Sequence, residues 1–514
     1  MDCALTPRNT HEWTSTDGTP LPDRASALEL LHPDGLAKRT MLIGSNCPPR
    51  LAPIFRESAS QLYDVIVLAP SLSECRTTGW LEQAVDVVNE QLAPHGVGYV
   101  MVPAVHRKRL RRLIRRSGLE IESAWAHRPD HATSRYLVPL QHPAARYAFK
   151  ALAPLNSTHQ HLMSVALALP GGGAFVADRV PAIGFAVRRP GARPLLQWLS
   201  QHCTDSIEHV TAAIKTRPPG RSQIATLICF NESQKNPLAI VKIGLTKEAV
   251  AECMSEVDHL RLLGSIAREA GIAFPKSRAV QIPGAYPTVI QSPLDGLPAA
   301  SLLMSGKLKS ATLMDPITNW LVAWNSATLS HQPWDADWLE QAIMAPARKL
   351  APLLEDSSAY LAWLATRCAE AAGRTAPMVM THNDLGAGNI LVDSQGGIGV
   401  VDWANAREQD IPLLDFFFAM ASVVATTLSY AEWPHAVSTC FAGAGSQTAA
   451  VAQNQRSLSR AIGMPADLID ICFHACWLRR ALTEHLEPSF MHTRPFLEIV
   501  RQLVRQPNLW PAHS

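Results

Sequence analysis

Two carboxylates and one carboxamide lie close together between residues 382 and 402, and their spacing suits phosphoryl transfer. The run HNDLGAGNILVD contains Asp384 and Asn389, and a glycine-containing turn and a short apolar strand then lead to Asp402. Transfer of a γ-phosphoryl group requires mainly positioning and charge neutralisation from the protein. We therefore predict that Asp384 is the base for an attacking hydroxyl, and that Asn389 and Asp402 bind Mg²⁺ through oxygen atoms.

The segment resembles the Brenner-type motif of the aminoglycoside phosphotransferase and choline kinase group, small-molecule kinases with a protein-kinase-like fold. The usual run in that group is His, any residue, Asp, Leu, two variable positions, Gly and Asn. A later Asp-Trp pair follows, which Asp402 and Trp403 supply. Gly386 and Ala387 replace a frequent His-Pro, and Ala404 replaces a frequent acidic residue. These departures leave the core groups in place.

The resemblance also implies two supporting residues. His382 is expected to support the catalytic loop, and Asp415, in the run PLLDF, is expected to brace it by hydrogen bonding. The competing interpretation is ordinary turn chemistry, because Asp and Asn favour turns through local backbone hydrogen bonds. Upstream context decides between the two interpretations.

A kinase small lobe should supply a lysine on a strand and a glutamate on the following helix. The run 237–245 predicts an apolar strand with Lys242 in its middle, and apolar residues at helical spacing predict a helix over 249–267. We predict that Lys242 binds the nucleotide phosphates and that Glu256 holds it in place. Two other glutamates on the same helix stay open as partners, namely Glu248 and Glu252. An edge-strand lysine facing solvent is the alternative for Lys242.

The remaining nucleotide contacts are predicted from a turn and a hinge. The hairpin before the lysine strand has one glycine, Gly220, in place of a GxGxxG pattern, so its backbone N–H groups are expected to cover the phosphates loosely. A solvated turn explains Gly220 equally well. The hinge between lobes is expected within 289–298, with adenine bound near Gln291. The sequence does not distinguish ATP from GTP.

The length of 514 residues exceeds what one hydrophobic core usually serves, so two or three domains are expected. The predicted fold class is an α/β N-terminal domain with a truncated Rossmann-like parallel sheet, followed by an α+β, protein-kinase-like bilobal domain. The predicted boundaries are a methyltransferase-like domain at 1–145, a bridging segment at 146–205, a small lobe at 206–292 and a helical large lobe at 293–514.

The segment 63–119 resembles the second half of a class I S-adenosylmethionine-dependent methyltransferase. It offers an aspartate-led strand, a helix, the turn LAPHG, a second strand and a basic helix. A cofactor-binding methyltransferase also needs a glycine-rich turn after its first strand, and no GxGxG is present. We therefore expect a degenerate domain that does not bind this cofactor.

The basic helix expected over 106–118 carries seven Lys and Arg residues, but no aromatic residues interleave for base stacking. With a formal net charge of only +2, the sequence favours no nucleic-acid partner. The apolar run 411–430 contains Asp415 and is expected to be a buried helix, not a membrane span. Scattered cysteines and a polar start predict a cytoplasmic location.

These observations predict an ATP- and Mg²⁺-dependent phosphotransferase acting on a hydroxyl of a small molecule, such as an aminoglycoside, an amino alcohol or a sugar. The alternative is a catalytically inactive scaffold or regulatory protein built from kinase-like and methyltransferase-like folds. The presence of all four groups, Lys242, Asp384, Asn389 and Asp402, favours the enzyme. Protein partners and oligomeric state are open.

Overall fold

The computed structural model of the chain divides into two compact units. The first comprises Met1–Ala153, Thr158–Met254 and Ser277–Pro293, and the second comprises Pro154–Ser157, Ser255–Lys276 and Leu294–Ser514. The structure describes residues 40–43, 62–128, 136–140, 144–151, 180, 182–191, 202–203, 210–216, 223–231, 236–281, 287–486 and 493–508.

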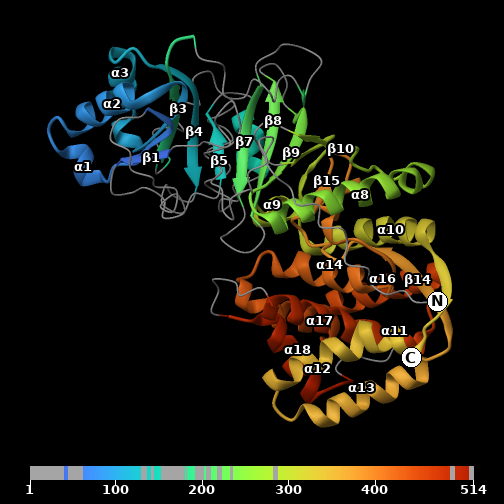
Figure 1. The fold of residues 1–514 in the computed structure, drawn as a ribbon. Helices are drawn as coiled ribbons and strands as arrows, with labels where there is room; N and C mark the ends of the chain where they lie inside the picture. The colour runs from blue at the N-terminus through green and yellow to red at the C-terminus, as the bar shows by residue number, and fades with distance from the viewer. Residues whose placement is uncertain are drawn as a thin grey trace. The chain divides into compact units, whose positions relative to one another are not determined.

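Eleven described strands of the first unit form one mixed sheet, in the order β1-β2-β3-β6-β4-β5-β7-β8-β9-β11-β10. Figure 1 shows them from blue to green. Their bounds are β1 Thr40–Ile43, β2 Tyr63–Leu68, β3 Leu92–Pro103, β4 Glu120–Arg128, β5 Tyr136–Pro139, β6 Ala182–Arg188, β7 Val210–Thr216, β8 Ile224–Asn231, β9 Ala239–Gly244, β10 Ser277–Gln281 and β11 Pro287–Gln291.

The parallel sheet predicted for residues 1–145 is found only in part. Only β1, β2 and β3 pair in parallel, and every other pairing in the sheet is antiparallel. The physical reason is that β6, from the segment expected to be a bridge, inserts between β3 and β4 and runs against both. Alternation of strands and helices along the chain cannot reveal such an insertion.

The helices α2 (Trp80–Gln91) and α3 (Arg107–Arg116) pack on β2, β3 and β4 of this sheet. Leu110 and Ile114 of α3 are buried, whereas most of its basic side chains are exposed. This is the amphipathic arrangement that the sequence predicted. Other described helices of the unit are α1 (Leu72–Arg76), which begins with a capping box at Ser71 and Glu74, and α4 (Ala144–Ala151).

A buried polar pair lies inside this otherwise apolar sheet. The Tyr99 hydroxyl is 2.8 Å from Nε2 of His127, and both side chains are buried. Gly184 on the intervening strand makes room for them, since a Cβ atom there would lie 2.2 Å from the Tyr99 oxygen. Glycine at this position is therefore required by the close approach of the two side chains.

The second unit is mainly helical. Within it α10 packs on α14 and α16, and α17 packs on α14 and α18. Helix α8 (Lys247–Glu269) enters the unit at Ser255. The other helices are α9 Ala299–Met304, α10 Ser310–Thr328, α11 Ala336–Leu339, α12 Ala345–Leu350, α13 Ser357–Ala371, α14 Leu414–Ala425, α15 Trp433–Phe441, α16 Ser446–Ile462, α17 Ile469–Leu486 and α18 Pro495–Arg505.

Two small three-stranded sheets in this unit carry the candidate catalytic segment. One has the order β12-β15-β16 and the other β13-β14-β17. Their bounds are β12 Leu297–Pro298, β13 Ser330–Pro333, β14 Thr375–Thr381, β15 Ile390–Val392, β16 Ile398–Val400 and β17 Arg407–Asp410. The segment 382–389 joins β14 to β15 and so connects the two sheets.

The apolar run expected to be a buried helix is α14, of which nearly every residue is buried. Among the described residues, no single helix is long and apolar enough to cross a membrane. Ser446–Ile462 and Ala466–Leu486 meet the length and composition criteria only as a pair, and this pair is bent by 114° at its break.

Candidate active site

The backbone of the catalytic segment is held in an unusual conformation. Among the described residues, five non-glycine residues have positive φ, and four of them lie between residues 383 and 413: Asn383, Asp402, Gln409 and Leu413. A left-handed conformation costs a non-glycine residue free energy, although Asn and Asp tolerate it best. Contacts from elsewhere in the unit must therefore hold the segment in place.

Asp384 is held by a residue that the sequence analysis missed. Its Oδ1 accepts a hydrogen bond from Nη1 of Arg480, in α17, at 2.8 Å. Its Oδ2 accepts one from Nδ2 of Asn389 at 3.1 Å. The Asp384 side chain is 37% exposed, so the carboxylate is fixed in orientation while part of it is open to solvent. A base that must meet a substrate hydroxyl needs this combination.

Asn389 and Asp402 lie at the open end of one hairpin. Strands β15 and β16 pair antiparallel, and the N–H of Val401 donates to the Asn389 carbonyl at 3.0 Å, so Asp402 follows directly. The Asn389 amide nitrogen donates to Asp384, which leaves its oxygen as the atom able to bind a cation. An amide oxygen beside a carboxylate is a donor set that suits Mg²⁺.

His382 and Asp415 contact the backbone around these groups. The Asp415 carboxylate accepts from the N–H of His382 at 2.6 Å and of Asn383 at 2.9 Å. His382 Nδ1 accepts from the N–H of Asp384 at 3.2 Å, and its Nε2 therefore donates to the Val401 carbonyl at 3.0 Å. His382 is thus hydrogen-bonded to both halves of the site. Burial raises the pKa of Asp415, against the opposing effect of His382.

A second ion pair, also missed from the sequence, fixes the start of the loop. Asp410 is buried and accepts from both terminal nitrogens of Arg479, at 2.6 and 2.7 Å, and from the hydroxyl of Thr381 at 2.9 Å. Asn383 donates to the same carboxylate at 3.2 Å. Burial alone would raise the pKa of Asp410, but the Arg479 guanidinium outweighs it and the pKa is lowered.

The positions that depart from the family's usual motif fit closely against α14. A Cβ atom on Gly386 would lie 3.3 Å from both Phe418 and Ser422, and the Ser422 hydroxyl accepts from the Ala387 N–H at 2.9 Å. The guanidinium of Arg480 lies over the Phe418 ring, 3.4 Å from its centroid. Two adjacent arginines directly after the apolar run Ala475–Leu478 were the sequence signal that could have revealed Arg479 and Arg480.

Glu256 is buried and contacts the metal-binding segment. Its Oε1 accepts from the N–H of Trp403 at 3.2 Å, and His259 Nδ1, on the same helix, lies 2.9 Å from the Trp403 carbonyl. Lys242 belongs to the first unit and Glu256 to the second, so their predicted pairing stays a prediction. Within its own unit, Glu256 fixes the backbone directly after Asp402.

Lys242 and Gln291 belong to the first unit. Lys242 lies on β9, between β8 and β11, and is only 8% exposed, so the alternative of a solvent-facing edge lysine is wrong. Gln291 ends β11 and is buried, and its Nε2 has no hydrogen-bond partner among the residues that the structure describes. Gly220 lies outside the described residues.

Comparison with known proteins identifies the region that carries these residues. Residues 240–452 match the phosphotransferase enzyme family. The resemblance predicted from the Asp384, Asn389 and Asp402 motif is thereby confirmed, and the family match implies kinase-type phosphoryl transfer. The match begins at residue 240, so the methyltransferase resemblance of 63–119 stays a prediction.

Solved structures similar to the chain include several phosphotransferases. A macrolide 2'-phosphotransferase type I is 14% identical, with a TM-score of 0.36, covering 60% of this chain and 95% of that chain. Choline kinase LicA from Streptococcus pneumoniae is 11% identical, with a TM-score of 0.29. The match covers 59% of this chain and 90% of that chain. The chain has no significant sequence match among curated proteins.

Proposed function

We propose that the protein is an ATP- and Mg²⁺-dependent phosphotransferase that moves a γ-phosphoryl group to a hydroxyl of a small molecule. The observation that supports this most strongly is the clustering of Asp384, Asn389 and Asp402 at one hairpin, within the region that matches the phosphotransferase family. Two carboxylates and one amide at this spacing are the kinds of group that phosphoryl transfer uses.

Asp384 orients the acceptor hydroxyl and accepts its proton as the oxygen attacks. Arg480 and Asn389 fix the two carboxylate oxygens from different directions, so Asp384 reaches the acceptor without first reorganising. Arg480 is a positioning residue in this proposal, because it acts through Asp384.

The Asn389 amide oxygen and the Asp402 carboxylate would hold Mg²⁺, which when bound neutralises charge on the nucleotide phosphates. Lys242 would contact the phosphates and Glu256 would set its position, while Gly220 would cover them. Gln291 would contact the nucleobase, since its buried amide nitrogen needs a hydrogen-bond acceptor. The acceptor is proposed to be an aminoglycoside, an amino alcohol or a sugar.

The first test is titration of the purified protein with MgATP, followed by phosphoryl transfer to acceptors from those three classes. Asp384→Asn should lower turnover by about 10²- to 10⁴-fold and keep MgATP affinity. Asp402→Asn should instead weaken MgATP binding. The matched control is Asp393→Asn, because Asp393 only caps the hairpin turn through the N–H groups of Gln395 and Gly397.

Full turnover by Asp384→Asn would overturn the assigned base. Absence of MgATP binding in the wild-type protein would favour the competing function, a catalytically inactive scaffold. Binding of S-adenosylmethionine in a parallel titration would show that the N-terminal region retains a cofactor site, contrary to our expectation.

A further inference from the structure

A cavity separate from the catalytic segment lies where α16 ends and α17 begins. Its volume is about 680 Å³, and it is lined by residues of both helices, by Arg367 of α13 and by Pro507 and Asn508. Gly463, with φ of 68°, ends α16 and turns the chain toward α17. Arg480 lies ten residues beyond Asp470 on α17, a rise of about 15 Å along the helix. The cavity is therefore distinct from the candidate active site.

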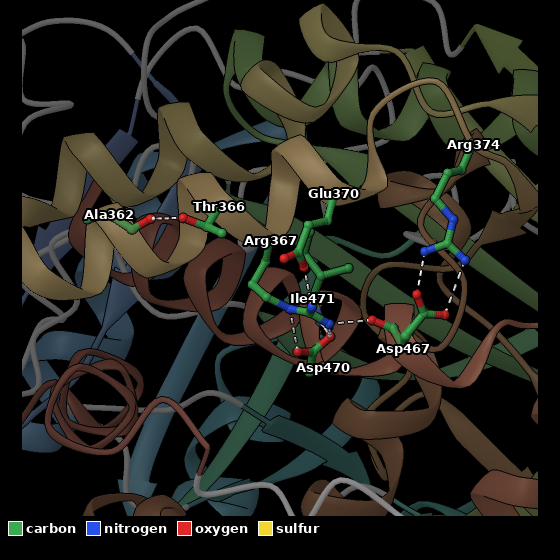
Figure 2. Close-up of polar contacts among 8 residues, drawn as sticks. All are labelled: Ala362, Thr366, Arg367, Glu370, Arg374, Asp467, Asp470 and Ile471. Carbon is green, nitrogen blue, oxygen red and sulfur yellow. Dashed lines mark hydrogen bonds and ion pairs between the residues drawn. The ribbon is translucent and has the colours of Figure 1, made fainter.

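The acidic residues that line the cavity are already neutralised. Arg367 donates to Oδ2 of Asp470 at 3.0 Å and to Oδ1 at 3.1 Å, and Arg374 forms an ion pair with Asp467. Figure 2 shows both arginines pointing at the aspartates around the start of α17. Glu370 adds a further carboxylate on Arg367. Neither aspartate is consequently left to attract a cationic ligand.

Two arginines at the cavity have no acidic partner among the described residues. Arg456 and Arg460 line it from successive turns of α16, both are exposed, and neither guanidinium has an ion pair or hydrogen bond among the residues that the structure describes. Residues four apart on a helix lie on one face, so the two guanidinium groups can reach the same anion. Arginine is well suited to bind carboxylate, sulfonate or phosphate oxygens.

In the wall of the cavity, one amide of a buried glutamine is only half satisfied. Gln455 is fully buried and lines the cavity, and its Nε2 donates to the Ser459 hydroxyl at 2.8 Å. Its Oε1 has no hydrogen-bond partner among the described residues. Because Gln455 has no exposed surface, this amide belongs to the packed wall behind the cavity and is not offered to a bound molecule.

We propose that this cavity binds a small organic anion with an apolar body. The anionic group would lie between Arg456 and Arg460, and the apolar body would contact Met464 and Ile469. Nothing in this proposal depends on the proposed phosphotransferase activity.

The test uses two fluorescent probes that differ by a single group. 8-Anilinonaphthalene-1-sulfonate has an aromatic body, an N–H donor and a sulfonate, and N-phenyl-1-naphthylamine lacks only the sulfonate. The wild-type protein should bind one equivalent of the sulfonate probe, about 10-fold more tightly than the neutral probe. The double variant R456A/R460A should lose that preference, whereas the charge-matched control R268A/K349A should keep it.

A second variant tests the location of binding without changing charge. Ala466 is exposed at the cavity, so Ala466→Trp fills its opening with little expected effect on folding, which circular dichroism would confirm. It should reduce the affinity for both probes by about 10-fold. Equal affinities in wild type, R456A/R460A and Ala466→Trp would overturn the proposal, as would binding of several equivalents insensitive to these changes.

Discussion

The catalytic segment of the second unit and the sheet of the first unit are stabilised in different ways. Around Asp384, charged and amide groups from distant parts of the chain converge, with Arg480 lying 96 residues away along the sequence. In the sheet, apolar side chains dominate, and the Tyr99–His127 pair joins strands separated only by β6. Removing the Asp384–Arg480 contact should therefore impair activity, whereas removing the Tyr99–His127 contact should affect only stability.

The largest expected effect is on the ion pair of Asp410 with Arg479. Arg479→Met would leave a buried carboxylate without its counter-charge, and we expect a loss of about 3–5 kcal/mol in unfolding free energy. Chemical denaturation monitored by tryptophan fluorescence would measure it. The double variant Asp410→Asn/Arg479→Met should recover part of the lost stability, because it removes both charges. A single variant as stable as wild type would contradict the role given to this pair.

Next in size is the effect of Arg480 on turnover. Arg480→Met should lower kcat by about 10- to 100-fold with a smaller change in the KM for MgATP, because Asp384 loses its orientation. Arg480→Lys should restore part of the activity. The control is Arg501→Met, which removes an exposed ion pair with Glu498 within α18. Equal losses of kcat in Arg480→Met and Arg501→Met would show that Arg480 does not position the base.

A smaller effect is expected in the sheet. Tyr99→Phe removes one buried hydrogen bond and should lower stability by about 1 kcal/mol, while MgATP binding and turnover stay at wild-type levels. Thermal unfolding and the transfer assay measure the two properties. Loss of turnover in a folded Tyr99→Phe protein would show that this contact affects activity as well as stability, contrary to the comparison.

The smallest effect is a dependence on pH. The folded-state pKa of Asp410 is below its usual value of 3.8, so the stability from its ion pair is fully present above that value. It is lost as the pH falls through the lower, folded-state pKa. The stability difference between wild type and Asp410→Asn should therefore shrink on acidification below pH 3.8 and stay constant above it. Denaturation curves across this range would show whether it does.

The local part of the site was accessible from the sequence, and the long-range part was not. Asp384, Asn389 and Asp402 lie within about twenty residues, so a loop and a hairpin suffice to bring them together. Arg479 and Arg480 depend on how α17 packs, and no pattern near residue 384 indicates that. The sheet shows the same limit, because the position of β6 is fixed by tertiary pairing and not by its own sequence.

The cluster of positive φ angles from Asn383 to Leu413 has a consequence for protein engineering. The segment adopts this shape because Asp410, Asp415, Arg479 and Arg480 hold it, so its geometry is a property of the whole helical unit. A peptide of residues 382–402, or a graft of it onto another hairpin, would relax to ordinary backbone angles and lose the alignment of Asp384 with Asn389. Any transplant of this chemistry must carry α14 and α17 with the loop.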